Sequence, residues 1–267
     1  MYPKSTHFLL ELIQNADDNQ YDLDPDDLPS LSLTYSGAFV RIACNEKGFT
    51  KKDVEAICRI GSSTKAGLQD STGEKGIGFK SVFSVADVVW IVSGAYSFRF
   101  EKKEELGMIA PIWSDYPKDF PSNFPSDFPS DFSHAQTGTV MLLRLSKDES
   151  RRSLDDEIKA FNPRILIFLR RLREIQFTTG KKVRKFRRTD QIAGSCRKTV
   201  LHNDGLDHHY IVIQSTAKSM PLEPRRPDSS TSEISLAFPL TETGQAIREP
   251  QQVFSYLPIR EYGFEVR

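Results

Sequence analysis

Hydrophobic residues near the start of the chain recur at intervals of three and four, which predicts an amphipathic helix over residues 6–19. The positions on its buried face are Leu9, Leu12, Ile13 and Ala16. By the same periodicity, Glu11, Asn15 and Asp18 lie together on a second, polar face. The sequence therefore places a carboxylate, an amide and a second carboxylate on one side of a single helix.

The next elements are two strands and a helix with recognisable ends. Short runs of β-favouring residues predict strands over 31–35 and 39–44. In the helix that follows, Thr50 is the N-cap, Asp53 occupies the capping-box position, and Gly61 ends the element. This order of helix, strand pair and helix makes up the first 60 or so residues.

Further elements follow from the same patterns. In chain order they are a Gly/Ser/Thr/Lys-rich loop over 61–78, a helix over 79–85, hairpin strands over 88–92 and 96–100, a strand over 139–145, a helix over 154–173 kinked at Pro163, and a strand over 174–177. The apolar residues predicted for the core of the long helix are Ile165, Leu166, Phe168, Leu169 and Leu172.

Two stretches differ in character from the rest. Residues 115–133 repeat Phe-Pro-Ser, and proline at this density removes backbone donors and blocks helices, so we expect an extended or disordered insertion. A ligand for a proline-binding domain is the alternative, but the repeat lacks the Pro-x-x-Pro spacing. After Gly180 short strands alternate with basic and polar links. This change predicts one domain over 1–180 and a partial second α/β domain over 181–267.

The composition narrows the class of protein. The 36 basic and 36 acidic residues cancel, so no net charge attracts the chain to nucleic acid or to a membrane. Three scattered cysteines fit a reduced intracellular setting, cytoplasmic or nuclear. No apolar run approaches the ~20 residues of a membrane span. Because helix and strand patterns reach both ends of the 267 residues, we expect the chain to be a fragment of a longer protein.

The polar face of the first helix has the residue types needed for phosphate chemistry. The amide oxygen of Asn15 can hold Mg²⁺, which takes few protein ligands and prefers phosphates and water for the rest. The carboxylate of Glu11, one turn away, can orient and deprotonate a water for attack on a phosphate. Three polar residues on a helix are more often a solvated face, and that alternative stays open at this point.

A glycine-rich loop, GEKGIGFKS over residues 73–81, opens the helix predicted at 79–85. Glycines let backbone N–H groups approach phosphate oxygens, and a helix N-terminus adds partial positive charge. A dinucleotide-binding loop is excluded because no strand directly precedes it, and a Walker A loop is excluded because the Gly-Lys-Ser/Thr ending is absent. A flexible turn without a ligand remains the alternative.

Several motifs occur in an order that resembles the Hsp90-like (GHKL, or Bergerat-fold) ATPases. They are ELIQNADD at 11–18, NEKGF at 45–49, IGSSTK at 60–65, GEKGIGFKSVF at 73–83 and TGTVMLLRL at 137–145. The residues of these motifs, together with LIFLRRLREI at 166–175 and FSYLPIREYGF at 254–264, are most similar to those of the sacsin and NO VEIN branch. The resemblance implies an α+β fold, a two-layer sandwich with helices on one face of a mixed, mostly antiparallel sheet.

The resemblance also implies roles for individual residues, with ATP and Mg²⁺ as ligands. Glu11 is expected as the general base and Asn15 as the Mg²⁺ ligand, with Asp18 on the ribose or adenine side. The remaining nucleotide-binding residues that it implies are Asn45, Lys65, Gly76, Gly78, Phe79 and Thr139. In this family nucleotide usually acts as a switch, in which a lid closes and slow hydrolysis resets it.

One departure from the family pattern concerns adenine recognition. The first glycine box usually begins with an Asp that accepts from the adenine amino group, and here Cys44 stands at that position, followed by Asn45 and Glu46. Gly48 alone keeps the glycine pattern. Loss of one buried acceptor costs roughly 1–3 kcal/mol, or about 10- to 100-fold in affinity. We expect weak nucleotide binding, in which the Asn45 oxygen replaces the lost acceptor.

Two hypotheses follow. The first is a working ATPase module in a chaperone-like or regulatory protein with unknown protein clients, and it rests on Glu11, Asn15 and the intact glycine-rich loop. The second is a degenerate scaffold that keeps the fold without catalysis, and it rests on the altered glycine box. A dimer is expected only if a segment upstream of residue 6 completes it. A histidine kinase is a distant third, because nothing in the sequence would receive the phosphate.

Two smaller features are interpreted conservatively. The basic run KKVRKFRR at 181–188 is predicted to be a solvated strand or turn, with a nuclear-import or nucleic-acid patch as the alternative. His208 and His209 are predicted to be surface residues, because no third ligand stands at a metal-binding spacing.

Overall fold

The computed structural model describes residues 7–58, 79–114, 138–146, 148–218, 231–249, 251–255 and 257–264. It divides the chain into two compact units. Unit 1 comprises residues 1–162 and 169–185, and unit 2 comprises Pro163–Phe168 and residues 186–267. The predicted insertion over 115–133 and the predicted helix end at Gly61 lie outside the described residues.

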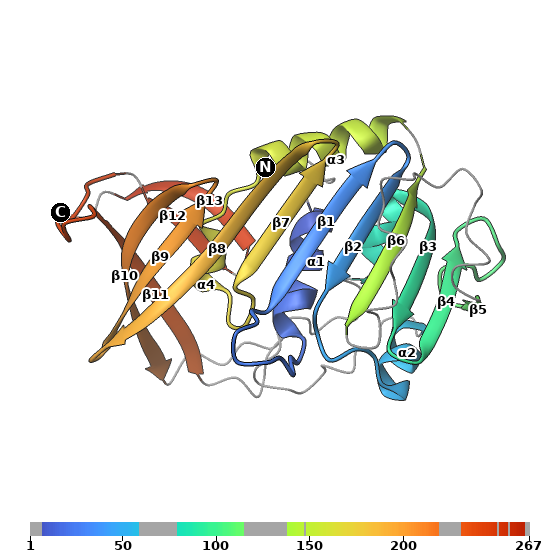
Figure 1. Cartoon of the computed structure of the whole chain (residues 1–267), viewed down its shortest axis with the longest axis horizontal. Helices are drawn as coiled ribbons and strands as arrows, with labels where there is room; N and C mark the ends of the chain where they lie inside the picture. The colour runs from blue at the N-terminus through green and yellow to red at the C-terminus, as the bar shows by residue number, and fades with distance from the viewer. Residues whose placement is uncertain are drawn as a thin grey trace. The chain divides into compact units, whose positions relative to one another are not determined.

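Unit 1 holds most of the elements predicted in the first part of the chain. They are α1 (His7–Asp18), β1 (Ser30–Ser36), β2 (Phe39–Cys44), α2 (Lys51–Cys58), the 3-10 helix η2 (Phe79–Ser84), β3 (Ala86–Ser93), β4 (Tyr96–Glu101), β5 (Ile112–Trp113), β6 (Thr139–Leu145), α3 (Asp148–Ala160) and β7 (Glu174–Thr179). Its strands pair in the order β7-β1-β2-β6-β3-β4-β5, as Figure 1 shows. The pairing of β1 with β7 is parallel, and the others are antiparallel.

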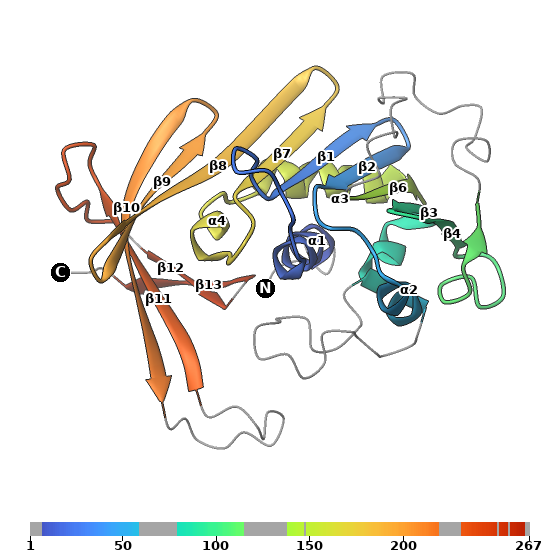
Figure 2. The same ribbon diagram turned by 60° about the horizontal axis from the view of Figure 1, so that its bottom comes forward.

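The core of unit 1 lies between its strands and its helices. Figure 2 shows α1 and α2 on the same side of these strands. Leu9 and Ile13 of α1 are buried, as the three- and four-residue spacing predicts. From the strands, the fully buried apolar side chains include Leu33, Val89, Ile91, Phe98, Phe100, Leu143 and Phe177. The position of α1 is thus fixed by an apolar stripe that leaves its other face outside the core.

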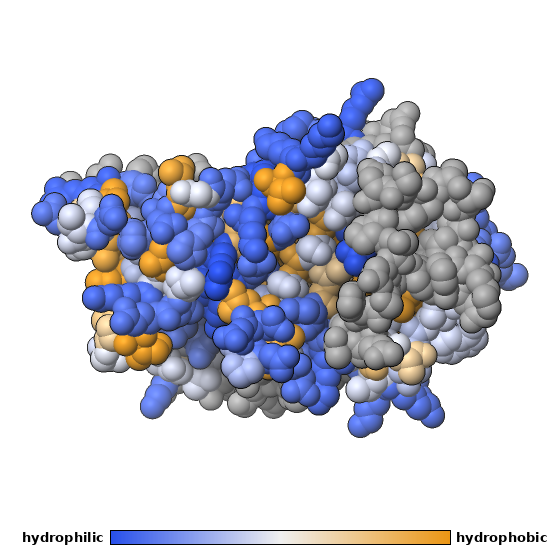
Figure 3. Space-filling model, in the orientation of Figure 1, coloured by the Kyte–Doolittle hydropathy of each residue, from blue (hydrophilic) through white to orange (hydrophobic). Residues whose placement is uncertain are grey.

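Unit 2 consists of strands that are longer than predicted. Its elements are α4 (Ile165–Phe168), β8 (Lys182–Ala193, from Phe186 onward), β9 (Cys196–Asn203), β10 (Leu206–Lys218), β11 (Thr231–Leu240) and the separate hairpin β12 (Gln251–Ser255) and β13 (Leu257–Phe264). Neighbouring strands from β8 to β11 are antiparallel. Figure 3 shows, on one face, hydrophobic residues in separate spots among hydrophilic ones over these strands.

The predicted fold class was wrong. The protein is built mostly on one mixed sheet in which eleven strands follow the order β11-β10-β9-β8-β7-β1-β2-β6-β3-β4-β5, rather than on a two-layer α+β sandwich. The physical reason is the register of β8 to β11, whose backbone groups hydrogen-bond over as many as ten residue pairs in β10 and β11. Short polar runs after Gly180 concealed these ladders, because solvent-facing strand positions carry polar residues.

The predicted long helix over 154–173 was also wrong in its extent. Helix α3 ends at Ala160, α4 covers only Ile165–Phe168, and the residues from 169 to 173 are not helical. Pro163 accounts for the interruption, because proline lacks a donor and disfavours the helical conformation of the residue before it. The residues predicted for the core of this segment are nevertheless buried at Ile165, Leu166, Leu169 and Leu172.

Candidate functional site

Helix α1 holds the three residues predicted to act on phosphates. Glu11, Asn15 and Asp18 are half-buried, whereas the intervening Ile13 and Ala16 are buried. The apolar stripe packs into unit 1, so the polar face stays at the border of the core. Helix α1 also contacts η2, the element that follows the glycine-rich loop. The helix that carries the predicted residues therefore lies beside the element that follows the glycine-rich loop.

The side chain of Asn45 is engaged in structural hydrogen bonds. Its Oδ1 accepts from the backbone N–H of Ser30 at 2.7 Å, and its Nδ2 donates to the carbonyl of Leu28 at 2.8 Å. These bonds fasten the end of β2 to the turn that precedes β1. An adenine amino group would have to share or replace the Ser30 bond, which makes Asn45 a poorer substitute for the family's Asp than its oxygen alone suggests.

Cys44 occupies the position at which the family pattern has an adenine-binding Asp, and it contacts Tyr21. The Tyr21 hydroxyl donates to the carbonyl of Ala16 at 2.7 Å and lies 3.3 Å from the Cys44 Sγ. Because the hydroxyl proton is given to Ala16, the Cys44 S–H is the donor in the second bond. Burial, followed by the neighbouring Cys44, raises the pKa of Tyr21 well above its usual range. Beside this pair Glu46 is buried, with 6% of its surface exposed.

The ends of β2, β3 and β6 converge on a buried pair of hydroxyls. The Ser93 Oγ accepts from the backbone N–H of Phe49 at 2.7 Å and lies 2.5 Å from the Thr139 Oγ1. Gly138 precedes Thr139 with a φ of +114°, and a Cβ there would lie 2.7 Å from the Cys44 carbonyl oxygen. Thr139 therefore lies beside the altered glycine box, as the motif order implies, but its hydroxyl is bonded to Ser93.

The predicted phosphate loop runs into η2, and the structure describes it only from Phe79 onward. The ring of Phe79 lies 5.8 Å from that of Phe100, centroid to centroid. The Lys80 Nζ donates to the carbonyls of Ile57 at 2.7 Å and of Met108. Burial lowers the pKa of Lys80, and the neighbouring Cys58 opposes that shift. Lys65, Gly76 and Gly78 lie outside the described residues.

Two residues with clear structural roles were missed by the sequence reasoning. Lys80 caps the last turn of α2 through Ile57, where a cation also complements the helix dipole. Asp17 is buried and accepts three backbone N–H groups from residues 170–172. A signal for Asp17 was present, since it stands four positions after Ile13 and so falls on the buried stripe of α1.

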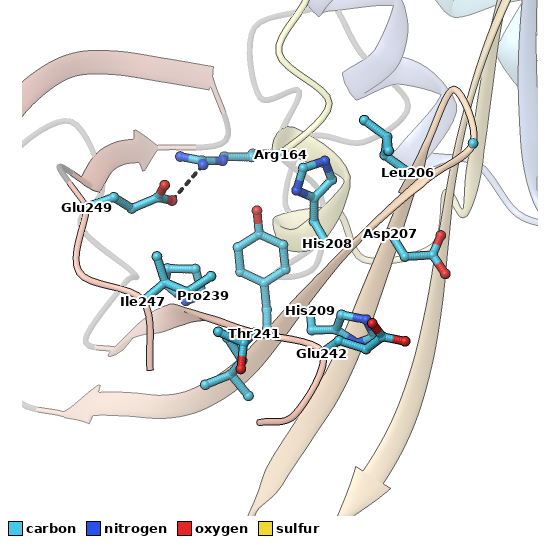
Figure 4. A pocket seen from close by; sticks show the side chains of 13 residues that line it. Arg164, Leu206, Asp207, His208, His209, Pro239, Thr241, Glu242, Ile247 and Glu249 are labelled. Atoms are coloured by element: carbon cyan, nitrogen blue, oxygen red, sulfur yellow. Dashed lines mark hydrogen bonds and ion pairs between the residues drawn. The ribbon is translucent and has the colours of Figure 1, made fainter. Parts of the chain in front are cut away.

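A cavity of about 470 Å³ lies within unit 2 and is shown in Figure 4. The Arg164 Nη2 donates to the Glu249 Oε1 at 2.6 Å, as Figure 4 shows. Tyr210 is buried, also lines the cavity and interacts with Arg164. His208 and His209 line it, His208 being exposed and His209 half-buried. None of the predicted nucleotide-site residues that the structure describes lines this cavity. Within the described part of the chain, no group of three or more His, Cys, Asp and Glu could hold a metal ion.

The basic run at 181–188 forms the start of β8, as the prediction of a strand or turn requires. Lys182 and Arg187 are exposed, but Arg188 is fully buried. Separately, no helix in the described segments is both long and apolar enough to span a bilayer.

Comparison with known proteins agrees with the branch that the motifs indicated. A Sacsin domain model matches residues 34–107, from β1 to the segment after β4. Protein NO VEIN of Arabidopsis thaliana is 31% identical over 278 residues, which cover 99% of this chain and 10% of that protein. Sacsin of Homo sapiens is 33% identical over 104 residues, which cover 35% of this chain and 2% of sacsin. The chain thus spans only a small part of the curated relatives it matches, and the matches support a place in the sacsin-like and NO VEIN-like branch.

Proposed function

We propose that this chain binds Mg-ATP in the manner of Hsp90-like ATPases and hydrolyses it slowly, as a conformational switch within a sacsin-like regulatory protein. The observation that carries the proposal is the face of α1, where Glu11, Asn15 and Asp18 remain half-exposed at the border of a packed core. Buried neighbours on the same helix hold the face in place. The contact between α1 and η2 supports the same location.

The donor set on this face fits the ligands. The amide oxygen of Asn15 suits Mg²⁺, whose other ligands would be phosphate oxygens and water. When bound, Mg²⁺ would neutralise charge on the phosphates. Glu11, one helical turn away, would orient the attacking water and take its proton. Asp18 would accept from the ribose or base at the far end of the face.

Nucleotide binding is the first test, by isothermal calorimetry with ATP and ADP in the presence of Mg²⁺. We expect micromolar binding by the wild type and its loss in Asn15→Ala. Gln176→Ala is the matched control, because Gln176 is a half-buried amide of unit 1 that alternates with the buried Ile175 and Phe177 and so faces away from the core. Absence of binding by a folded wild-type protein would overturn the proposal.

Turnover is the second test, and it separates binding from chemistry. Glu11→Ala should keep nucleotide affinity and abolish phosphate release, because the carboxylate acts on water rather than on the bound nucleotide. Glu55→Ala, a change of an exposed carboxylate on α2, should leave both quantities unaltered. Turnover that persists unchanged in Glu11→Ala would exclude Glu11 as the base.

A second candidate function is a scaffold that keeps the fold without nucleotide chemistry. It is favoured by the Asn45 side chain, whose two polar groups are bonded to Ser30 and Leu28, and by Cys44, which bonds to Tyr21. Both positions on which adenine recognition would depend therefore have partners within the chain. Calorimetry decides between the candidates, since a scaffold predicts no heat of binding for either nucleotide while the protein is folded by circular dichroism.

A further inference from the structure

Asp17 holds the last turn of α1 to a distant part of unit 1. Its Oδ2 accepts from the backbone N–H of Arg170 at 2.8 Å, and its Oδ1 accepts from Arg171 at 2.7 Å and from Leu172 at 2.8 Å. The Arg171 side chain also reaches the carbonyl of Asp17 at 3.4 Å. Only 2% of Asp17 is exposed.

Three charge-assisted bonds from consecutive amides make this contact strong and directional. A buried carboxylate is costly unless donors surround it, and successive backbone N–H groups form a concave site suited to an anion. Breaking the contact leaves the charge, or the three amides, without partners. The contact therefore persists in the folded protein and constrains both segments that it joins.

The contact fixes the rotation of α1 about its own axis. Asp17 stands four positions after Ile13 on the buried stripe, whereas Asn15 and Asp18 project from the other face. Apolar packing at Ile13 tolerates small rotations, because it is not directional. Three hydrogen bonds at Asp17 do not, because their energy falls steeply away from linearity.

We propose that Asp17 is a positioning residue for the nucleotide site, one that sets the direction of Glu11 and Asn15 and couples nucleotide binding to the turn at 170–172. This proposal rests on the Mg-ATP function proposed above. Asp17 itself touches no ligand, since its carboxylate is buried on the turn. By reciprocity, if the bonds between Asp17 and residues 170–172 favour the orientation of α1 that binds nucleotide, bound nucleotide strengthens these bonds.

The variant that tests this is Asp17→Asn, which keeps size but replaces one acceptor oxygen by an NH₂ that faces a donor. A misplacement of about 1 Å can cost about 100-fold in reaction rate, so turnover should fall in this variant. Because Asn15 also shifts, we expect ATP affinity to fall about tenfold or more. Asp17→Glu keeps the carboxylate and should recover part of the affinity. Asp155→Asn on α3 is the control, a half-exposed carboxylate paired with Lys159, and should bind as the wild type does.

Hydrogen exchange in the wild type tests the coupling without any variant. We expect ATP to slow exchange at the amides of residues 170–172, and this protection to be absent in Asp17→Asn. A role in stability alone predicts no ATP-dependent change at 170–172. If Asp17→Asn bound ATP with the same affinity as the wild type, the positioning role would be overturned and the proposed function would stand. The same conclusion would follow if ATP did not change hydrogen exchange at residues 170–172 in the wild type. No binding by the wild type would instead overturn the function and the positioning role together.

Discussion

Ser93 and Thr139 hold their hydroxyl oxygens 2.5 Å apart, at a cross-strand pair between β3 and β6. Both residues are buried, with 0% and 2% of their surface exposed. The Ser93 Oγ also receives the backbone N–H of Phe49 at 2.7 Å, so this one hydroxyl connects two strands to the loop after the altered glycine box. One small polar side chain therefore helps to hold this loop beside the sheet.

Substitution Ser93→Ala should destabilise unit 1 by about 1–3 kcal/mol, because the Phe49 amide and the Thr139 hydroxyl lose their partner. Urea unfolding followed by the fluorescence of Trp90, which is buried in the same strand, would measure the loss. The double variant with Thr139→Val should lose less than the sum of the single changes, since both hydroxyls are then removed. Additive losses would contradict the bond between them.

Replacing Gly138 by a residue with a side chain should lower the stability of the fold more than the same change at other turn glycines. Its φ is +114°, and a Cβ would approach the Cys44 carbonyl oxygen to 2.7 Å. We expect Gly138→Ala to lose about 3 kcal/mol or more, from both strain and the clash. Gly37→Ala is the control, with a φ of +58° and open space around the added carbon, and should lose only about 1 kcal/mol. Equal losses by urea unfolding would contradict the close approach.

The stabilising effect of Tyr21 should depend on pH. Burial, then Cys44, raises its pKa in the folded protein above the usual 10.0, so the unfolded chain gives up this proton first as the solution becomes alkaline. The folded state then binds more protons than the unfolded state, and stability falls as pH rises above about 10. At pH 7 we expect Tyr21→Phe to lose about 1 kcal/mol through the bond to Ala16. The difference between the two proteins should shrink between pH 9 and about 11, and a constant difference would contradict the shift.

The elements that the sequence predicted well are those whose information is local. The spacing of Leu9, Ile13 and Ala16 places α1 correctly, because burial follows helical periodicity. The capping box is also confirmed, since the Thr50 backbone N–H donates to the Asp53 carboxylate at 2.9 Å and the Asp53 N–H lies 3.4 Å from the Thr50 Oγ1. Both signals involve residues within a few positions of each other.

What the sequence did not predict depends on contacts between distant residues. The parallel pairing of β1 with β7 joins Leu31 to Ile175, and no short-range pattern specifies such a partner. The hydrogen bonds of the Asp17 carboxylate likewise join α1 to residues 170–172, and their donors are backbone amides that any sequence would offer. Periodicity indicated the predicted site face and the burial of Asp17, whereas the partner segment at 170–172 could not be inferred from it.

Arg188 is another residue whose role depends on contacts with residues distant in sequence. It lies in unit 2, where its buried cationic side chain takes a place that an apolar core would fill. Its side chain is 0% exposed, its Nη1 donates to the carbonyls of Leu166 and, at 3.3 Å, of Ile167, and its Nε lies 3.0 Å from the Asp190 carboxylate. Arg188→Met should destabilise unit 2 by about 2–4 kcal/mol, because two carbonyls and a carboxylate lose a charged donor.

The adjacent Arg187→Met is the matched control for Arg188, since Arg187 is exposed on the opposite face of β8 and its loss should change stability by no more than about 0.5 kcal/mol. Hydrogen exchange of the β9 amides reports on unit 2 directly, and we expect it to accelerate in Arg188→Met alone. Asp190 keeps the Thr199 hydroxyl at 2.8 Å and Arg197 at 3.4 Å in that variant, so the loss stays below that of an isolated buried charge. Equal exchange in the two variants would mean that the carbonyls of α4 find other donors and that Arg188 is dispensable to the fold.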